Sequence, residues 1–208
     1  SHPKDMSEDL IEVYKHSKKL MPLVHLPIQS GSNKILKLMN RKHLISDYLK
    51  IFEKLKKINS KIEFSSDFII GYPGENNIDF DKTYEIIKKV KFINSFSFIF
   101  SPRPGTVASN LNLIEKKICM ERLEKIQNQL YENQINMNKS LEDKVINVLA
   151  ENPTEDGKKI FGKSEYMTSV IFSGKDKDIG KIVPVKIIKS NRSTLFGELA
   201  VNLNQKVA

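Results

Sequence analysis

The chain has 208 residues, of which 39% are hydrophobic and 28% are charged, and its formal net charge is +9. This length allows one large domain or two modest ones, and the composition is that of a globular protein rather than a disordered one. The single cysteine excludes an internal disulfide framework. It also excludes a site in which this chain alone supplies three or four cysteine ligands to zinc or an iron–sulfur cluster.

The sequence contains no run of about 18 apolar residues, so we expect no membrane span. Its N-terminus lacks the apolar core of a secretion signal, and a cytoplasmic protein is the expectation. The basic excess is a weak indicator of nucleic-acid binding. Only four of the 34 basic residues are arginine, the side chain that bidentate phosphate and base recognition favours.

Strand-like and helix-like runs alternate over residues 1–110. Three runs are apolar and strand-like, at residues 23–28, 62–70 and 96–100. Four runs have helical character: residues 7–16, residues 32–39, a run after a predicted N-cap at Ser46, and a run after Asp79. Because parallel strands need long connections, this alternation indicates parallel pairing.

Three strands are too few for a closed barrel of eight β/α units, so this region is either a small open sheet or part of a larger barrel. A long helix, predicted over residues 114–141, closes this domain. Beyond it, five short β-rich runs separated by glycines predict a small antiparallel barrel of the OB-like kind: residues 144–150, 159–163, 168–172, 181–188 and 193–199. The expected domains are therefore residues 1–137 and 138–208.

Polar, glycine-bearing loops follow all three strands of the first domain, at residues 29–32, 71–75 and 101–106. In parallel β/α folds ligands bind at the carboxyl ends of strands, so three such loops at one edge indicate a binding site. Each loop also has a plain structural explanation, such as a turn at Pro73-Gly74 or a helix N-cap at Ser32. A carboxylate in a buried strand, as at Asp67, needs polar partners; the alternative is a structural role near the strand end.

Three segments resemble the radical S-adenosylmethionine methylthiotransferases: HLPIQSGSNKILKLMNR (25–41), SSDFIIGYPGE (65–75) and SFIFSPRPGT (97–106). The segment IGKIVPVKIIKSNRSTLFGEL (179–199) resembles the end of a TRAM domain, the small RNA-binding β-barrel that closes these enzymes. The resemblance implies an α/β fold comprising the C-terminal half of a radical-SAM (β/α) barrel followed by a TRAM, OB-like barrel. Ser1–Pro3 would then end the third barrel strand, and the three predicted strands would be the fourth to sixth.

The resemblance also implies an activity. The family members most like this chain add a methylthio group to C2 of N6-isopentenyladenosine at position 37 of tRNA, by radical chemistry. They use S-adenosylmethionine and two [4Fe–4S] clusters, whose cysteine ligands would precede Ser1, so the chain alone is expected to be inert. The full-length protein is expected to be a cytoplasmic monomer that binds the tRNA anticodon stem-loop and no membrane.

The family's motifs assign roles to individual positions here. Contacts with S-adenosylmethionine are expected from Gln29, Ser30, Ser66, Asp67, Ile69, Gly71 and Phe100. Substrate contacts are expected from Arg103, Lys159, Lys163 and Lys181. A glycine lets a flat ring approach the backbone closely, and an arginine can stack on a base or hold a phosphate. No catalytic residue and no metal ligand is assigned within this chain, and Cys119 is expected to be a packing residue.

Two alternatives remain open. The first is a sister methylthiotransferase that acts on threonylcarbamoyladenosine in tRNA or on an aspartate of a ribosomal protein. The second is a non-catalytic RNA-binding module, in which aromatic side chains of the barrel stack on bases among lysines. The candidates for stacking are Phe161, Tyr166, Phe172 and Phe196. At least two of these four are expected in the barrel core instead.

Overall fold

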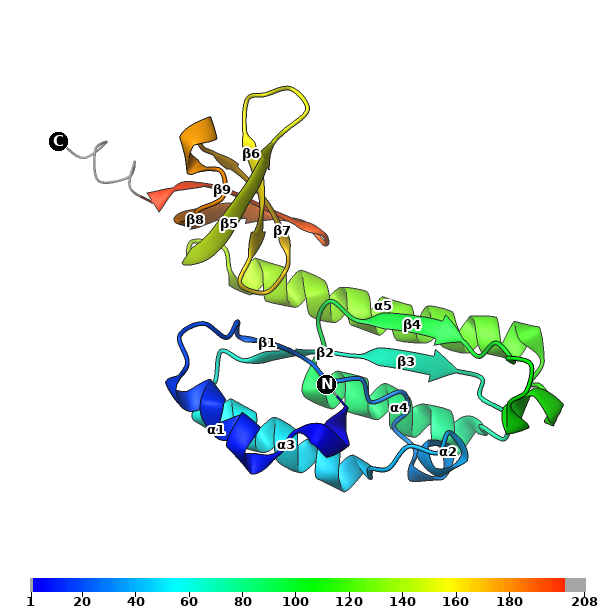
Figure 1. The fold of residues 1–208 in the computed structure, drawn as a ribbon. Helices are drawn as coiled ribbons and strands as arrows, with labels where there is room; N and C mark the ends of the chain where they lie inside the picture. The colour runs from blue at the N-terminus through cyan, green and yellow to red at the C-terminus, as the bar shows by residue number, and fades with distance from the viewer. Residues whose placement is uncertain (1, 201–208) are drawn as a thin grey trace. The chain divides into compact units, whose positions relative to one another are not determined.

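The computed structural model describes residues 2–200, and the chain divides into two compact units (Figure 1). Of the described residues, the first unit comprises 2–20 and 24–130, and the second comprises 21–23 and 131–200. The division falls inside the long helix α5 (Lys116–Ser140). The domain boundary predicted after residue 137 lies in the same helix.

The first unit contains four short strands: β1 (Leu23–His25), β2 (Glu63–Ser65), β3 (Asp67–Ile70) and β4 (Phe96–Ile99). β1 pairs with β2, and β3 pairs with β4 in parallel, as the alternation of elements predicted. An isolated parallel bridge between Gln29 and Phe68 joins the two pairs.

The predicted strand over residues 62–70 is interrupted, and the strand predicted over residues 23–28 ends early. The cause is Ser66, which lies between β2 and β3. Its side-chain Oγ accepts a hydrogen bond from the backbone N–H of Ile28 at 2.9 Å. A side chain therefore takes the place of a backbone acceptor, and the regular ladder stops there.

The helices of this unit are α1 (Glu8–His16), α2 (Asn33–Leu38), α3 (Ile45–Ile58), α4 (Asn77–Val90) and the first part of α5. Short 3₁₀ helices span Val107–Asn110 (η2) and Pro3–Asp5 (η1). Of the segment Ser1–Pro3, expected to end a strand, Ser1 lies outside the described residues and Pro3 instead begins η1.

Two helix starts differ from the prediction. Helix α3 begins after Leu44, so Ser46 lies inside its first turn, and α4 begins after Asn76 rather than after Asp79. In both helices an aspartate at the third helical position accepts a hydrogen bond from the N-cap backbone N–H. These bonds join Asp47 to Leu44 at 3.1 Å and Asp79 to Asn76 at 3.2 Å. An aspartate near the start of a helix therefore does not always mark the residue at which the helix begins.

The core of the first unit lies between the strands and the helices, which cover one face of the strands. In β3, Phe68 and Ile70 are fully buried in this core, whereas Asp67 and Ile69 point to the opposite face. In the parallel register Asp67 and Ile69 lie beside Phe96 and Phe98, which are 60% and 56% exposed. We call these four residues the open face. Strands covered by helices on one side only are the arrangement expected of part of a (β/α) barrel.

The second unit contains a closed barrel with strand order β5-β6-β7-β9-β8. Its strands are β5 (Val145–Pro153), β6 (Ile160–Ser164), β7 (Ser169–Ser173), β8 (Ile182–Ser190) and β9 (Thr194–Leu199), with a 3₁₀ turn η3 (Asp176–Asp178) before β8. All five predicted strands are present, which confirms the OB-like interpretation.

The sequence suggested an antiparallel barrel, but β7 and β9 pair in parallel. The other pairings, β5–β6, β6–β7, β5–β8 and β8–β9, are antiparallel. An odd number of strands that alternate in direction can close into a barrel only if one neighbouring pair runs the same way. The parallel pair is therefore a consequence of five-stranded closure.

Candidate functional site

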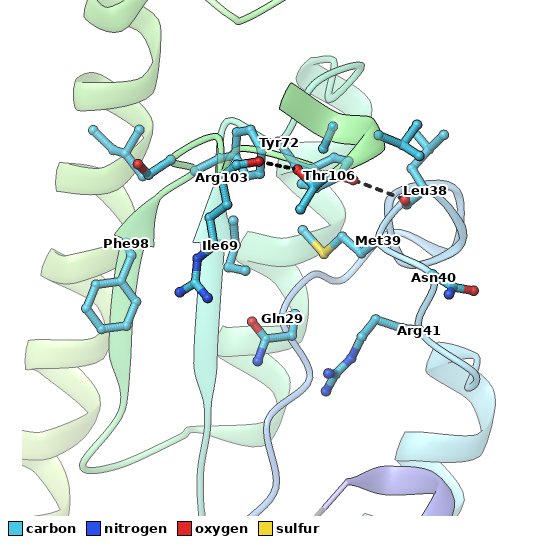
Figure 2. Close-up of a pocket in the computed structure, with 15 residues that line it drawn as sticks. Gln29, Leu38, Met39, Asn40, Arg41, Ile69, Tyr72, Phe98, Arg103 and Thr106 are labelled. Carbon is cyan, nitrogen blue, oxygen red and sulfur yellow. Dashed lines mark hydrogen bonds between the residues drawn. The ribbon is translucent and has the colours of Figure 1, made fainter. Parts of the chain in front are cut away.

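A cavity of about 760 Å³ opens in the first unit at the carboxyl ends of β3 and β4 (Figure 2). Its lining comes from several segments. Gln29 follows β1, Ile69 is in β3, and Phe100 and Arg103 follow β4, while Arg41 follows α2. Loops after successive strands meet at this edge because the strands are parallel, as the sequence predicted.

Gln29 has an unusual backbone, with a φ of 71°. Its N–H donates to the carbonyl of Asp67 at 3.0 Å, and its carbonyl accepts from the N–H of Ile69 at 2.9 Å. Both backbone groups are therefore held by β3, and the side chain lies in the cavity (Figure 2). A left-handed backbone at a residue other than glycine costs about 1–2 kcal/mol, and such conformations concentrate at functional sites.

An apolar wall bounds the cavity on one side. The rings of Tyr72 and Phe100 meet edge to face, with centroids 4.8 Å apart. The Tyr72 hydroxyl donates to the carbonyl of Leu38 at 3.0 Å, which fixes its ring against the end of α2 (Figure 2). Ile69 and Met39 also line the cavity. A flat aromatic ligand could pack against this wall.

Arg41 is a cavity residue to which the sequence analysis assigned no role. One of its terminal nitrogens, Nη2, donates to the carbonyl of Pro27 at 3.1 Å, while its buried Nε has no protein partner. Burial lowers the pKa of Arg41, and the nearby Asp67 carboxylate opposes that effect. Figure 2 shows Arg41 and Arg103 on either side of the Gln29 side chain.

Two arginines and no acidic residue are found among the described residues that line this cavity. The charge therefore favours an anionic group, because guanidinium groups bind carboxylate and phosphate oxygens with good geometry. The scarcity of arginine in a lysine-rich chain was the available signal for Arg41. Arg41 is the last residue of the segment 25–41, which carries part of the family resemblance.

The other residues predicted to contact the cofactor lie outside the cavity. Ser30 is fully buried, with its Oγ 3.3 Å from the Thr83 hydroxyl of α4. Ser66 is fully buried and bonded to Ile28. Asp67 lies on the open face, with its carboxylate 3.6 Å from the His25 ring.

Gly71 lies behind the cavity wall, in a turn with a φ of 73°. A Cβ at this position would come within 2.4 Å of the Cys119 sulfur, so only glycine suits both the backbone and the space. The Gly71 N–H donates to Glu75 Oε1 at 3.1 Å. Cys119 is buried and packs against this turn, which confirms its predicted packing role.

The predicted RNA contacts lie on the barrel. Lys159 lines a groove of about 700 Å³ together with Phe161 and Phe196. The Lys163 ammonium lies 5.3 Å from the Phe161 ring centroid and donates to Ser169 Oγ at 3.0 Å. Lys181 is exposed just before β8 and does not line this groove.

Of the four candidate stacking aromatics, two are buried in the barrel core and two are at its surface. Tyr166 is 4% exposed and Phe172 is fully buried, which confirms that at least two belong to the core. Phe161 and Phe196 are half-buried on the outer surface.

The described part of the chain contains no group of three or more histidine, cysteine, aspartate or glutamate side chains arranged to hold a metal ion. Its helices also include none that is long and apolar enough to cross a membrane.

Comparison with known proteins identifies both units. Residues 1–87 match the Radical SAM superfamily, and residues 139–200 match the TRAM domain. The resemblance seen in the sequence is thereby confirmed.

The chain is 66% identical over all 208 residues to the tRNA-2-methylthio-N(6)-dimethylallyladenosine synthase of Pelagibacter ubique (strain HTCC1062), and covers 47% of that protein. It is 44% identical over 200 residues, or 95% of its length, to the synthase of the same name from Wolbachia pipientis wMel, and covers 46% of it. The chain thus spans about half the length of these relatives.

Among solved structures, the chain resembles coproporphyrinogen III oxidase from Escherichia coli, a radical SAM enzyme, with a TM-score of 0.53 at 12% identity. The match covers 79% of this chain and 45% of that one. This likeness shows the fold alone, and it agrees with the α/β fold class expected from the sequence.

Proposed function

We propose that this chain is part of a tRNA methylthiotransferase that adds a methylthio group to C2 of N6-isopentenyladenosine at position 37. The observation that carries the proposal is the 66% identity, over the whole chain, to a tRNA-2-methylthio-N(6)-dimethylallyladenosine synthase. The cavity at the strand ends supports it, since its lining combines an apolar wall with two arginines. This chain supplies part of the cofactor site and the RNA-binding barrel of the complete protein.

The cavity residues suit S-adenosylmethionine. The Arg41 guanidinium, which lines the cavity, is suited to the cofactor's carboxylate, and the Gln29 amide can bond to ribose hydroxyls. Ile69 and the wall of Tyr72 and Phe100 suit the adenine ring. Ser30, Ser66 and Gly71 support this site from behind by fixing the backbone, and Asp67 supports Arg41 by its charge.

The two [4Fe–4S] clusters of the proposed enzyme need cysteine ligands from elsewhere in the protein. The one cysteine here, Cys119, is buried behind Gly71 and does not line the cavity. When bound, the clusters and S-adenosylmethionine supply the radical and sulfur-transfer chemistry. The residues of this chain hold the cofactor, orient its ring and exclude water.

The proposed macromolecular partner is the anticodon stem-loop of tRNA. Arg103 is exposed at the rim of the cavity, where it can stack on the target nucleotide or hold a phosphate. Lys159, Lys163 and Lys181 lie on the barrel and would contact the RNA backbone. We expect the complete protein to act as a cytoplasmic monomer.

The test is a transfer assay with the full-length protein, reconstituted with its clusters and supplied with S-adenosylmethionine and a reductant. Three substrates are compared: tRNA bearing N6-isopentenyladenosine, tRNA bearing threonylcarbamoyladenosine, and ribosomal protein. Methylthio incorporation into the first alone is the expected result. Incorporation into either of the others instead would identify a sister enzyme, and incorporation into none would overturn the proposal.

A further inference from the structure

Three polar side chains from neighbouring strands form a cluster beside the open face. His25 ends β1, Ser65 ends β2 and Asp67 begins β3. The His25 Nδ1 lies 2.9 Å from Ser65 Oγ, and the His25 Nε2 lies 3.6 Å from Asp67 Oδ2. We call these three residues the polar cluster.

The polar cluster points away from the hydrophobic core. Val24 and Leu26 are buried in the core, so His25 between them points to the opposite face. The side chains of His25 and Asp67 are 49% and 31% exposed, whereas Ser65 is buried beneath them. A buried hydroxyl thus supports an imidazole and a carboxylate that a ligand on the open face can reach.

The hydroxyl of Ser65 sets the tautomer of the His25 ring. When the Ser65 O–H donates to Nδ1, the ring proton is on Nε2, where it faces the Asp67 carboxylate. A carboxylate favours a proton beside it, so both neighbours support the same tautomer. The 3.6 Å between Nε2 and Oδ2 is longer than a hydrogen bond. A ligand with an acceptor and a donor side by side can therefore bond to both atoms.

The polar cluster adjoins the cavity at the strand ends. Ile69 and Phe98 belong both to the open face and to the lining of the cavity. Asp67 precedes Ile69 by two residues on the same face of β3, so it lies about 7 Å from it along the strand. Beside Asp67, the exposed Phe96 ring lies nearly parallel to the Phe98 ring, with centroids 6.4 Å apart. A ligand that bonds to the cluster therefore has aromatic surface and the cavity next to it.

A donor beside an acceptor is the pattern that recognises adenine. The Hoogsteen edge of adenine presents N7 as an acceptor next to the N6 donor. The N6 and N7 atoms are about 3 Å apart, wider than N6 and N1, and their spacing is the closer match to that of His25 Nε2 and Asp67 Oδ2. An alkyl group on N6 lies on the N1 side, because N7 crowds it on the other. The one remaining N6–H of an N6-alkyl adenosine therefore faces N7.

We propose that the polar cluster holds the Hoogsteen edge of the substrate adenine, with His25 Nε2–H donating to N7 and the Asp67 carboxylate accepting N6–H. The inference rests on the proposed function, in which the substrate is N6-isopentenyladenosine. N7 and C2 lie on opposite sides of the purine, so this arrangement leaves C2, the atom to be modified, uncovered. The isopentenyl group can pack on the exposed rings of Phe96 and Phe98. Ser65 is a positioning residue, because it acts through His25.

Anticodon stem-loops with altered bases at position 37 test each bond, with affinity for the reconstituted full-length protein measured by fluorescence anisotropy. N6-methyl-N6-isopentenyladenosine has no N6–H, and it should bind roughly 10- to 100-fold more weakly than N6-isopentenyladenosine, since a bond to a charged group is lost. The 7-deaza analogue has no N7 acceptor and should bind roughly 3- to 10-fold more weakly. The 1-deaza analogue keeps the Hoogsteen edge and should bind as well as the parent.

Substitutions assign each preference to its side chain. Asp67→Ala should bind the N6-methyl and parent stem-loops equally, and His25→Phe should bind the 7-deaza and parent stem-loops equally. Ser65→Ala should reduce the preference for N7 alone. Asp81→Ala is the matched control, because Asp81 is an exposed carboxylate of α4 away from the open face, and it should keep both preferences.

A ratio of two affinities separates recognition from folding. A smaller folded fraction, or weaker cofactor binding through Arg41, changes both affinities of a variant equally and leaves their ratio unchanged. Equal affinities of the unchanged protein for all four stem-loops would overturn the proposal, as would preferences that persist in Asp67→Ala and His25→Phe. Weaker binding of the 1-deaza analogue in place of the 7-deaza one would also overturn it, because the Watson–Crick edge would then be the one held.

Failure of this inference is distinguishable from failure of the proposed function. Methylthio incorporation into tRNA bearing N6-isopentenyladenosine tests the activity of the unchanged protein, whichever edge of the base it holds. Incorporation without the predicted preferences would overturn the role of the polar cluster alone.

Discussion

Arg122 of α5 and Glu75, in the loop after β3, form a buried ion pair in which Nη1 lies 2.7 Å from Oε1. The same carboxylate oxygen accepts the N–H of Gly71, and Arg122 Nη2 donates to Asn77 Oδ1 at 2.8 Å. Burial raises the pKa of Glu75, and the bonds from Gly71 and Arg122 oppose that effect. The pair therefore holds the turn after β3 against helix α5. This turn supports the Tyr72 side of the cavity.

Removing the arginine should be costly, because it leaves a buried carboxylate without its counter-charge. We predict that Arg122→Met lowers the free energy of unfolding by about 3–5 kcal/mol, measured by urea denaturation. Arg122→Lys keeps the charge and loses the bond to Asn77, so its cost should be smaller. Equal losses in the two variants would show that the charge of Arg122 does not stabilise this turn.

Arg41 should determine affinity for the anionic end of the cofactor. We predict that Arg41→Gln in the full-length protein weakens binding of S-adenosylhomocysteine by roughly 10- to 100-fold, as loss of a charged hydrogen bond does. Lys42→Gln removes the same charge from the adjacent, exposed residue and is the control. Binding of adenosine, which has no carboxylate, should be unchanged in both variants. Equal affinities of the two variants for S-adenosylhomocysteine would contradict this role for Arg41.

His43 should make the fold sensitive to acid. It is buried, neither ring nitrogen has a partner within the described residues, and its ring lies edge to face against His2 at 5.2 Å. Burial, with smaller effects from Arg41 and His2, lowers the pKa of His43 to about 4. The ring in the unfolded chain titrates near 6.5, so between these values the unfolded state binds the extra proton.

Stability should therefore fall as the pH drops from about 6.5 to 4, by up to about 3 kcal/mol from this residue. We predict that His43→Leu reduces the loss of stability between about pH 7.5 and pH 5, measured as urea midpoints. If the variant and the unchanged chain lose the same amount, His43 is not the source of acid sensitivity.

Gly71 should tolerate no side chain while Cys119 is present. Gly71→Ala incurs about 1–2 kcal/mol from the left-handed backbone, and the contact with the Cys119 sulfur adds to that loss. Cys119→Ala removes the sulfur, so the double variant should lose less stability than the sum of the two single variants. A coupling energy near zero in this double-mutant cycle would contradict the close packing of the turn.

Much of the fold followed from residue patterns, because each strand and helix has a local apolar periodicity. The exceptions arose from side chains that replace backbone partners. Ser66 interrupts a strand by accepting a bond from Ile28, and Asp79 caps α4 from within its first turn. No local pattern distinguishes such a serine from an ordinary one, since its partner is set by tertiary structure. For α4 a local signal was present, because Asn76 stands three residues before Asp79, the spacing of a capping box.

The candidate site was predictable to the extent that loops after strands indicate it. Gln29 and Phe100 were named from the sequence, and both line the cavity. Arg41 was not, because it follows a short helix rather than a strand. Ser30 lies behind the cavity wall, whereas the neighbouring Gln29 lies in the cavity. This difference depends on the positive φ of Gln29, which no sequence pattern revealed.

The most direct test of the proposed activity is mass spectrometry of tRNA nucleosides from a strain in which the gene is deleted. We predict that 2-methylthio-N6-isopentenyladenosine disappears and N6-isopentenyladenosine accumulates, and that the full-length gene restores the methylthio group. An unchanged level of 2-methylthio-N6-isopentenyladenosine in the deletion strain would contradict the account.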